Sequence, residues 1–323
     1  MKRIYLLASS LPLLLLLALS IGATEVDAVW ATIFSFDFTS STLDNQIIWQ
    51  IRAPRVIAAV LIGAILGIAG TLSQAATNNP LADPALLGTT AGAAAGVVIG
   101  VAFNLVSLGS FAAVVAATIG AMLATLFTFW LARSALQLII MGIAVSAILT
   151  ALVGVAISLI DRPDLRSISF WSLGSLALIA PSDLLALFAI AVVVLLIAFT
   201  LSRDLDLLSL GDNAVRHIGR DPQRIRLIAF LTLSVAIAAS VSTVGTIAFL
   251  ALAAPHIARF IVGPRHRTLL IAAAVIGAVI LLLADTGARS IAPPQDLPIG
   301  ILVAILAAPL LILTLKKGQM QWR

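Results

Sequence analysis

The sequence predicts an all-α polytopic membrane protein with about ten transmembrane helices and a broken-helix inverted repeat. Of its 323 residues, 61% are hydrophobic and only 10% are charged, whereas a soluble domain carries about 25% charged residues. The long apolar runs lack the alternation that β-barrel strands need. This composition excludes a water-soluble enzyme, a disordered protein and a coiled coil. With no cysteine and only three histidines, neither disulfides nor a multi-ligand metal site is expected on the chain.

Ten apolar runs approach the length of about 20 residues that a membrane-spanning helix requires. They cover residues 4–23, 56–76, 90–106, 110–132, 138–160, 184–201, 227–251, 254–262, 269–284 and 299–315. The eighth run is shorter than a bilayer. The first run, which follows Lys2 and Arg3, also resembles a secretory signal peptide. We expect it to remain as a helix, because everything downstream also needs the membrane.

The positive charges predict the orientation of these spans. With the N-terminus in the cytoplasm, 14 of the 19 lysines and arginines fall in cytoplasmic segments. The other five, in outer segments, are Arg52, Arg55, Arg162, Arg166 and Arg289. Because cytoplasmic loops carry the excess of positive charge, both termini are expected in the cytoplasm.

Three polar segments separate the spans: residues 24–55 and 161–183 on the outer side, and residues 203–226 on the cytoplasmic side. The cytoplasmic segment contains five arginines and four aspartates, and Gly211 and Gly219 divide it into two short amphipathic helices. A basic loop could lie on anionic lipid. Its mixed charge favours a docking surface for a soluble partner, with Gly211, Asp212, Arg216 and Gly219 as candidate residues.

A pattern of glycine and proline occurs twice. Gly70 and Thr71 are followed by Pro80 and Gly88, and Gly245 and Thr246 are followed at the same spacing by Pro255 and Gly263. Five spans separate the copies, so their topologies would be inverted, as in many transporters. Chance is the alternative for four matched positions. Proline independently predicts an interrupted helix at each place, because it removes a backbone donor.

Polar residues lie near both predicted interruptions. They could line a translocation path, or they could cap backbone groups that the interruption frees. The candidates are Gln74, Asn78, Asn79, Pro80, Pro255 and His256. A lone histidine without carboxylate or cysteine companions is a poor iron ligand, so no metal is assigned to His256. Glycines spaced by four, at 63 and 67 and at 92, 96 and 100, predict close helix packing.

Residues 52–96 resemble the opening signature of the FecCD-type permeases, the membrane subunits of ABC importers for iron-siderophores, haem and cobalamin. The matching residues are Arg52, Pro54, Arg55, Gly63, Gly70, Gln74, Asn79, Pro80, Leu81, Ala82, Pro84, Leu87, Gly88, Gly92 and Ala93. Four later blocks of this sequence also resemble the family. The first is Trp171 with Gly174, Ser175 and Leu176, and the second is Leu210, Gly211 and Gly219. The third is Gly245, Ile247, Phe249, Pro255, His256 and Arg259, and the fourth is Asp285, Arg289, Leu297, Pro298, Gly300 and Pro309.

The resemblance implies a single transmembrane permease domain over residues 1–323, with residues 203–226 as the cytoplasmic coupling loop. It implies a cell inner-membrane protein that pairs with a second permease copy, identical or paralogous. Two ATPase subunits would dock in the cytoplasm and hold ATP and Mg, and a periplasmic binding protein would deliver an iron-siderophore or a haem- or cobalamin-like chelate. The chain itself has no GxxxxGK[ST] loop, so we expect a transporter subunit without a cofactor, in contact with membrane lipid and not with nucleic acid.

The resemblance also assigns a role to Arg52, Arg55 and Arg289. Family members receive their binding protein on arginines at matching positions, and the planar guanidinium suits bidentate contact with carboxylates. Two alternatives are snorkelling of Arg52 and Arg55 at the interface and an intrahelical pair of Arg289 with Asp285.

Two other functions compete with the importer. An ion-coupled secondary transporter also fits inverted repeats, but it usually carries a carboxylate at membrane depth, and Asp285, near the end of a span, is the nearest one here. An intramembrane enzyme is disfavoured, since neither GxSxG nor HExxH occurs.

Overall fold

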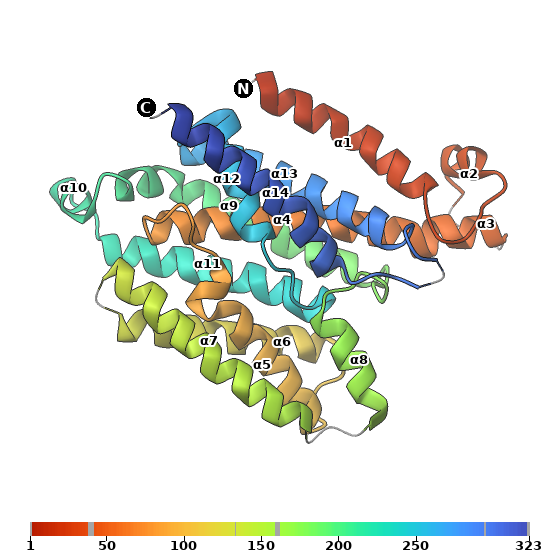
Figure 1. Ribbon diagram of the computed structural model, residues 1–323, viewed down its shortest axis with the longest axis horizontal. Coiled ribbons are helices and arrows are strands. Elements are labelled where there is room, and N and C mark those ends of the chain that lie inside the picture. Colours follow the sequence, from red (N-terminus) through yellow and green to blue (C-terminus); the bar gives the residue numbers. More distant parts are fainter. Residues whose placement is uncertain (1, 38–41, 133, 159–161, 294, 322–323) are drawn as a thin grey trace.

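The computed structural model describes residues 2–37, 42–132, 134–158, 162–293 and 295–321, and within these ranges the regular elements are helices alone (Figure 1). The predicted all-α class is confirmed. Arg133, Asp161 and Arg323, which entered the charge pattern, lie outside the described residues, as do residues 38–41 of the first outer segment. The helices are α1 (Lys2–Ser20), α2 (Val29–Ser35), α3 (Leu43–Asn45), η1 (Gln46–Arg52), α4 (Ala53–Ala76), η2 (Pro84–Leu87), α5 (Thr89–Ala102), α6 (Phe111–Leu131), α7 (Ala135–Ser158), α8 (Arg162–Ser172), α9 (Asp183–Leu208), α10 (Asp212–His217), α11 (Pro222–Val244), α12 (Leu250–Val262), α13 (His266–Ala288) and α14 (Ile299–Gln321).

Six helical segments of the described chain are long and apolar enough to cross a membrane. They are Leu43–Ala76, Phe111–Leu131, Leu136–Ser158, Asp183–Leu208, Pro222–Val244 and His266–Ala288. Four shorter apolar helices, within α1, α5, α12 and α14, correspond to the remaining predicted runs. The chain is therefore a multi-pass membrane protein, and the count of about ten spans stays a prediction.

Helix α4 forms the centre of the bundle and packs against α9, α11, α12 and α13. In its segment, 78% of the most apolar window is buried inside the protein. The close approach to α13 depends on small residues, because a Cβ at Gly63 or Gly67 would collide with backbone carbonyls of that helix. Gly92 and Gly96 bring α5 against α6 in the same way. The glycine spacing thus serves packing within one chain.

The outer segment 24–55 contains more helix than the sequence predicted. The span begins at Leu43, as α3 and the π-helical η1 lead directly into α4. Polar residues in this stretch interrupt the hydropathy, so the apolar run became visible only at Val56. The wider π turn ends at Arg52, a kind of insertion that is frequent at functional sites.

The second interruption lies earlier than predicted. Helix α11 ends at Val244, and Gly245 and Phe249 then adopt positive φ angles of 77° and 65°. Pro255 lies inside α12, so its assignment as the point of the break was wrong. The run of apolar side chains is continuous through residues 227–251, and hydropathy alone could not locate a break made by backbone angles.

The two glycine–proline copies do not occupy equivalent places. In the first, Pro80 lies in the turn after α4 and Gly88 caps the start of α5. In the second, Pro255 is helical and Gly263 caps the end of α12. The four matched positions therefore do not mark structurally equivalent places, and the inverted repeat stays a prediction.

The two ends of the bundle are distinct in Figure 1. Helix α10 lies at one end, and α2, α3 and α8 lie toward the other. Helix α7 is the least covered of the long helices, since only 17% of its most apolar window is buried. Its uncovered face consists of large aliphatic side chains, among them Ile140, Ile143, Ile148, Leu152 and Val155.

Candidate functional site

Two arginines and two aspartates form an ion cluster at the end of the bundle opposite α10. Arg55 Nε lies 2.6 Å from Asp285 Oδ1, and Arg55 Nη1 lies 2.8 Å from Asp296 Oδ2. Arg289 Nε lies 3.4 Å from the other oxygen of Asp285. Helices α4 and α13 supply the main partners, so their close packing positions the cluster. The Asp285 side chain has no exposed surface. A charged carboxylate can be buried in this way only when cations neutralise it, and here both arginines do so.

The C-terminus of α1 is held at the same place. Arg52 donates to the carbonyls of Leu19 and Ser20 at 2.9 and 3.0 Å and also to that of Thr24, while Arg289 donates to that of Ala18. The last carbonyls of a helix have no partner within the helix, and cations near them are favourable. Arg52 and Arg289 thus fix α1 onto η1 and α13.

The three arginines that the family resemblance assigns to docking have internal partners. Arg52, Arg55 and Arg289 are 4%, 7% and 4% exposed. In this chain on its own the three side chains therefore do not form an open cationic surface, and both docking of a binding protein and snorkelling of Arg52 and Arg55 stay predictions. The pair between Arg289 and Asp285, expected from their spacing of four, is present. Sequence reasoning missed Asp296, because its partner Arg55 lies 241 positions earlier.

Helices α4 and α12 cross at a point where their backbones nearly touch. Pro255 has no N–H for the carbonyl four residues before it, and this carbonyl, of Ala251, lies against Gly70 with no room for a Cβ. One turn further, Gln74 Nε2 donates to the Leu252 carbonyl at 3.2 Å, and Arg259 Nη2 donates to Gln74 Oε1 at 3.1 Å. Gln74 therefore joins α4 to α12.

The residues after α4 cap backbone groups, as one of the two interpretations expected. Asn78, at φ 50°, donates to the carbonyl of Leu208 at 3.0 Å, and Asn79 Oδ1 accepts from the amide of Leu81 at 2.9 Å. Pro80 is exposed in this turn. His256 Nδ1 is buried without a partner, and among the described residues no group of three or more His, Asp or Glu side chains could hold a metal ion.

The coupling segment is tied to the end of α4 by a residue that the sequence did not single out. Arg226 donates through Nη1 and Nη2 to both carboxylate oxygens of Asp212, at 2.9 and 2.6 Å, and through Nε to the carbonyl of Ala76 at 2.9 Å. The hydrogen bonds from Arg226 lower the pKa of Asp212 below its usual value, so the carboxylate is charged at neutral pH. The bidentate geometry links α10, α11 and α4.

Gly211 and Gly219 flank α10 with φ angles of 94° and 78°. A Cβ at either position would meet no atom within 4 Å, so both are required for their backbone angle and not for close packing. Val215 is buried, whereas Leu210 and Ile218 are 70% and 60% exposed and Arg216 is also exposed. The segment thus presents an apolar and cationic surface at this end of the bundle.

A cavity of about 330 Å³ lies between α5 and α7. Its polar lining is made of hydroxyl groups and the indole of Trp171, and the lining residues include no charged side chain. These hydroxyl-bearing residues are Thr90, Ser146, Thr150, Ser172 and Thr246. Ser146, Ser172 and Thr246 already donate to backbone carbonyls, so these three hydroxyls offer an occupant mainly acceptor oxygens. Such a wall can still bind neutral polar groups by hydrogen bonds.

Comparisons with known proteins match this architecture over nearly its full length. The FecCD transport family matches residues 10–317. The hemin transport system permease protein HmuU of Yersinia pestis is 36% identical over 92% of this chain and 91% of its own length. The iron(3+)-hydroxamate import system permease protein FhuB of Bacillus subtilis is 34% identical over 91% of this chain and 77% of its own length.

A solved structure agrees with the fold. A metal-chelate type ABC transporter in an inward-facing conformation superimposes with a TM-score of 0.87 at 29% identity, covering 98% of this chain and 99% of that one. The chain therefore belongs to the FecCD transport family and is a transmembrane permease subunit of an ABC importer, not itself an enzyme.

Proposed function

We propose that this subunit moves a metal chelate, of the iron-siderophore or haem class, into the cytoplasm between its own α7 side and that of a second permease copy. The observation that carries the proposal is the hydroxyl-lined cavity beside the uncovered face of α7. Neutral hydroxyls give a bulky chelate weak hydrogen bonds that are easily exchanged. The names of similar permeases, for hemin and for iron hydroxamate, support the class of cargo.

Uptake by cells tests this proposal. The chain is produced with its ATPase and binding protein, and entry of a ⁵⁵Fe-labelled hydroxamate, of hemin and of cobalamin is compared. We expect one of the three to accumulate. Replacing Ser146 and Thr150 by alanine should lower its entry while leaving the amount of protein in the membrane unchanged. Equal entry of all three, or none above cells that lack the permease, would argue against a selective chelate path.

We propose that the coupling segments of the two permease copies are the docking surfaces for the two ATPase subunits. Gly219→Val should impair their retention, because a β-branched residue at φ 78° costs about 1–2 kcal/mol in the left-handed region and displaces the loop. Gly219→Asn is the matched control, since asparagine tolerates this conformation. Co-purification of the ATPase should fall for valine only. Equal retention of both variants would remove the docking role of this loop.

A periplasmic binding protein is proposed to dock at the end that carries the arginine cluster. Arg52 is bonded to neutral carbonyls, and a carboxylate from the partner is a stronger acceptor for a guanidinium. Arg52→Gln should therefore weaken capture of the binding protein by about tenfold, the equivalent of 1.4 kcal/mol, and more at low salt. If the folded variant binds the binding protein with unchanged affinity at low salt, Arg52 does not contact that protein, and its role is to hold α1.

We propose that the protein lies in the cell inner membrane. In the proposed topology both termini and α10 lie in the cytoplasm. The exposed arginines beside α10 support this orientation. A reporter that is active only in the cytoplasm should work when fused after Arg220 and fail when fused at Asp164 in α8. The reverse pattern would invert the whole arrangement.

A further inference from the structure

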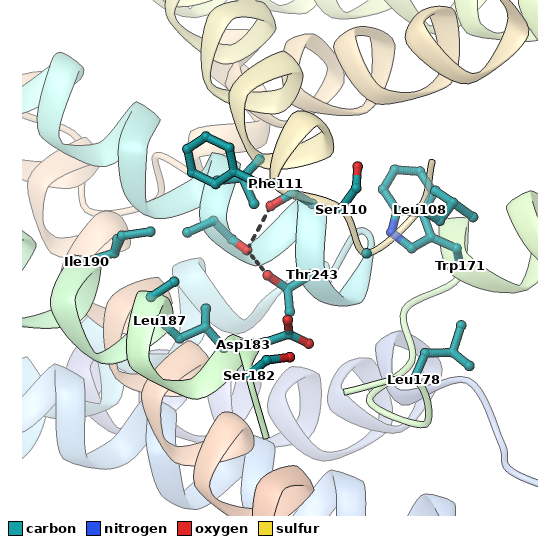
Figure 2. A pocket seen from close by; sticks show the side chains of 15 residues that line it. Leu108, Ser110, Phe111, Trp171, Leu178, Ser182, Asp183, Leu187, Ile190 and Thr243 are labelled. Carbon is teal, nitrogen blue, oxygen red and sulfur yellow. Dashed lines mark hydrogen bonds between the residues drawn. The ribbon is translucent and has the colours of Figure 1, made fainter. Parts of the chain in front are cut away.

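We propose that a second cavity, between α6, α9 and α11, is a binding site for a phospholipid with an ammonium headgroup. One acyl chain would lie among apolar walls, an ester carbonyl would accept from the indole N–H of Trp171, and the ammonium group would lie beside Asp183 (Figure 2). The cavity has a volume of about 450 Å³, within the roughly 300–1,000 Å³ of small-molecule sites.

The walls of this cavity suit hydrocarbon. Leu108, Phe111, Val114, Leu187 and Ile190 contribute apolar side chains. The hydroxyls of Ser242 and Thr243 also line it, but both already donate to the carbonyl of Ala239, at 3.2 and 2.7 Å (Figure 2). Their donors are used within α11, so the inner wall offers an occupant mainly aliphatic surface.

Trp171 provides the polar group that needs a partner. It is 5% exposed, and its Nε1 is buried without a hydrogen-bond partner. Figure 2 shows the indole nitrogen on the side of the ring that faces the cavity. A buried donor left unpaired costs about 1–3 kcal/mol. Indole rings favour the membrane interface, where one end is apolar and the other is polar.

The position of the mouth selects the occupant. Phe111 of α6 and Leu178 line the cavity and are exposed. Helices α6 and α9 both carry long uncovered apolar surfaces, with only 33% and 22% of their most apolar windows buried. Asp183 is the one charged residue in the lining. A carboxylate at the mouth attracts an ammonium headgroup and repels an anionic one, which also disfavours an acidic chelate here.

Fluorescence quenching tests the site in the full-length protein. Trp171 is kept as the only tryptophan by replacing Trp30, Trp49, Trp130 and Trp322 with phenylalanine, and the protein is placed in nanodiscs with lipids brominated on the acyl chain. Phosphatidylethanolamine should quench Trp171 at an about fivefold lower mole fraction than phosphatidylglycerol, as expected for one favourable surface charge contact. Asp183→Asn should bring the two curves together.

Two variants of α9 separate the cavity from the general lipid surface. Ala186 lines the cavity and Ala189 does not, although both are exposed on the same helix. Ala186→Phe should reduce the quenching, and Ala189→Phe should leave it unchanged. In protein with its other tryptophans intact, Trp171→Phe should lower the phosphatidylethanolamine retained in native mass spectra by about fivefold.

Several results would overturn the proposal. These are equal quenching by both headgroups, equal effects of the two phenylalanine variants, and full lipid retention by Trp171→Phe. Trp171 lines both cavities, so an added iron chelate that protects Trp171 in the unchanged protein but not in Ala186→Phe would instead make this cavity part of the cargo path. A second measurement, the elution volume of each variant in size-exclusion chromatography, identifies any that fails to fold.

Discussion

Asp285→Asn should destabilise the protein by about 3–5 kcal/mol, the range found when one partner is removed from a buried ion pair. The substitution keeps the shape of the side chain but leaves Arg289 without a carboxylate, and it leaves Arg55 with Asp296 alone. Because Arg289 also holds the last turn of α1, that helix should loosen as well. The free energy of unfolding, measured in lipid nanodiscs by pulse proteolysis, gives the loss directly.

Asp296→Asn is the matched control for this experiment. Its side chain is 24% exposed, and among the described residues its carboxylate bonds only to Arg55. In this variant Arg55 still has its ion pair with Asp285. We expect a loss below about 1 kcal/mol, as for a solvated pair. Equal losses for the two variants would mean that the cluster is hydrated and that its burial does not control stability.

Gly70→Ala should have the other large effect. The added methyl group would overlap the carbonyl of Ala251 at the crossing of α4 and α12, and a backbone group cannot rotate away as a side chain can. Overpacking of this kind costs typically 1–3 kcal/mol and occasionally more, and we expect the upper end. The contact of Gln74 with Leu252 should be lost at the same time, because it depends on the same helix separation.

The control for this prediction is the same substitution at Gly154. This glycine lies in α7, and a Cβ there would meet no atom within 4 Å. Gly154→Ala should be neutral or should stabilise the helix by about 0.5–1 kcal/mol. The amount of folded protein recovered after size-exclusion chromatography should be lower for Gly70→Ala than for Gly154→Ala. Similar yields from both would show that the crossing is wider than the structure indicates.

The sequence predicted the helical class and the apolar runs because both depend on composition and local hydropathy. It could not place the break at Gly245 and Phe249, since backbone angles there are fixed by packing, with Gly245 lying against the carbonyl of Trp171. Nor could it find the partners of Arg55, which lie 230 and 241 positions away. A charged residue just outside an apolar run was therefore assigned to the surface.

The coupling segment shows the same limit. Its two glycines follow from local pattern, and their positive φ angles on either side of α10 agree with that part. The prediction of two short helices is wrong, because α10 is a single short helix and the rest of the segment belongs to the ends of α9 and α11. The importance of Arg226 depends on the carbonyl of Ala76, 150 residues earlier, and no local pattern distinguishes it from its neighbours. Resemblance to a family supplied the function, whereas the physics of the sequence alone reached only a multi-pass protein with a docking loop.

The structure also weighs against coupling to an ion gradient. Among the described residues, Asp285 is the one carboxylate with no exposed surface, and two arginines already neutralise it. A coupling carboxylate has to gain and lose a cation or a proton during transport, and this one is held in a closed cluster.

The most direct test is chelate uptake into proteoliposomes that contain the permease with its ATPase, and with its binding protein on the outside. We predict that ⁵⁵Fe-labelled chelate accumulates only when ATP and Mg are enclosed, and that dissipating the proton and sodium gradients leaves the rate unchanged. Accumulation without ATP, driven by an imposed proton or sodium gradient, would contradict the account.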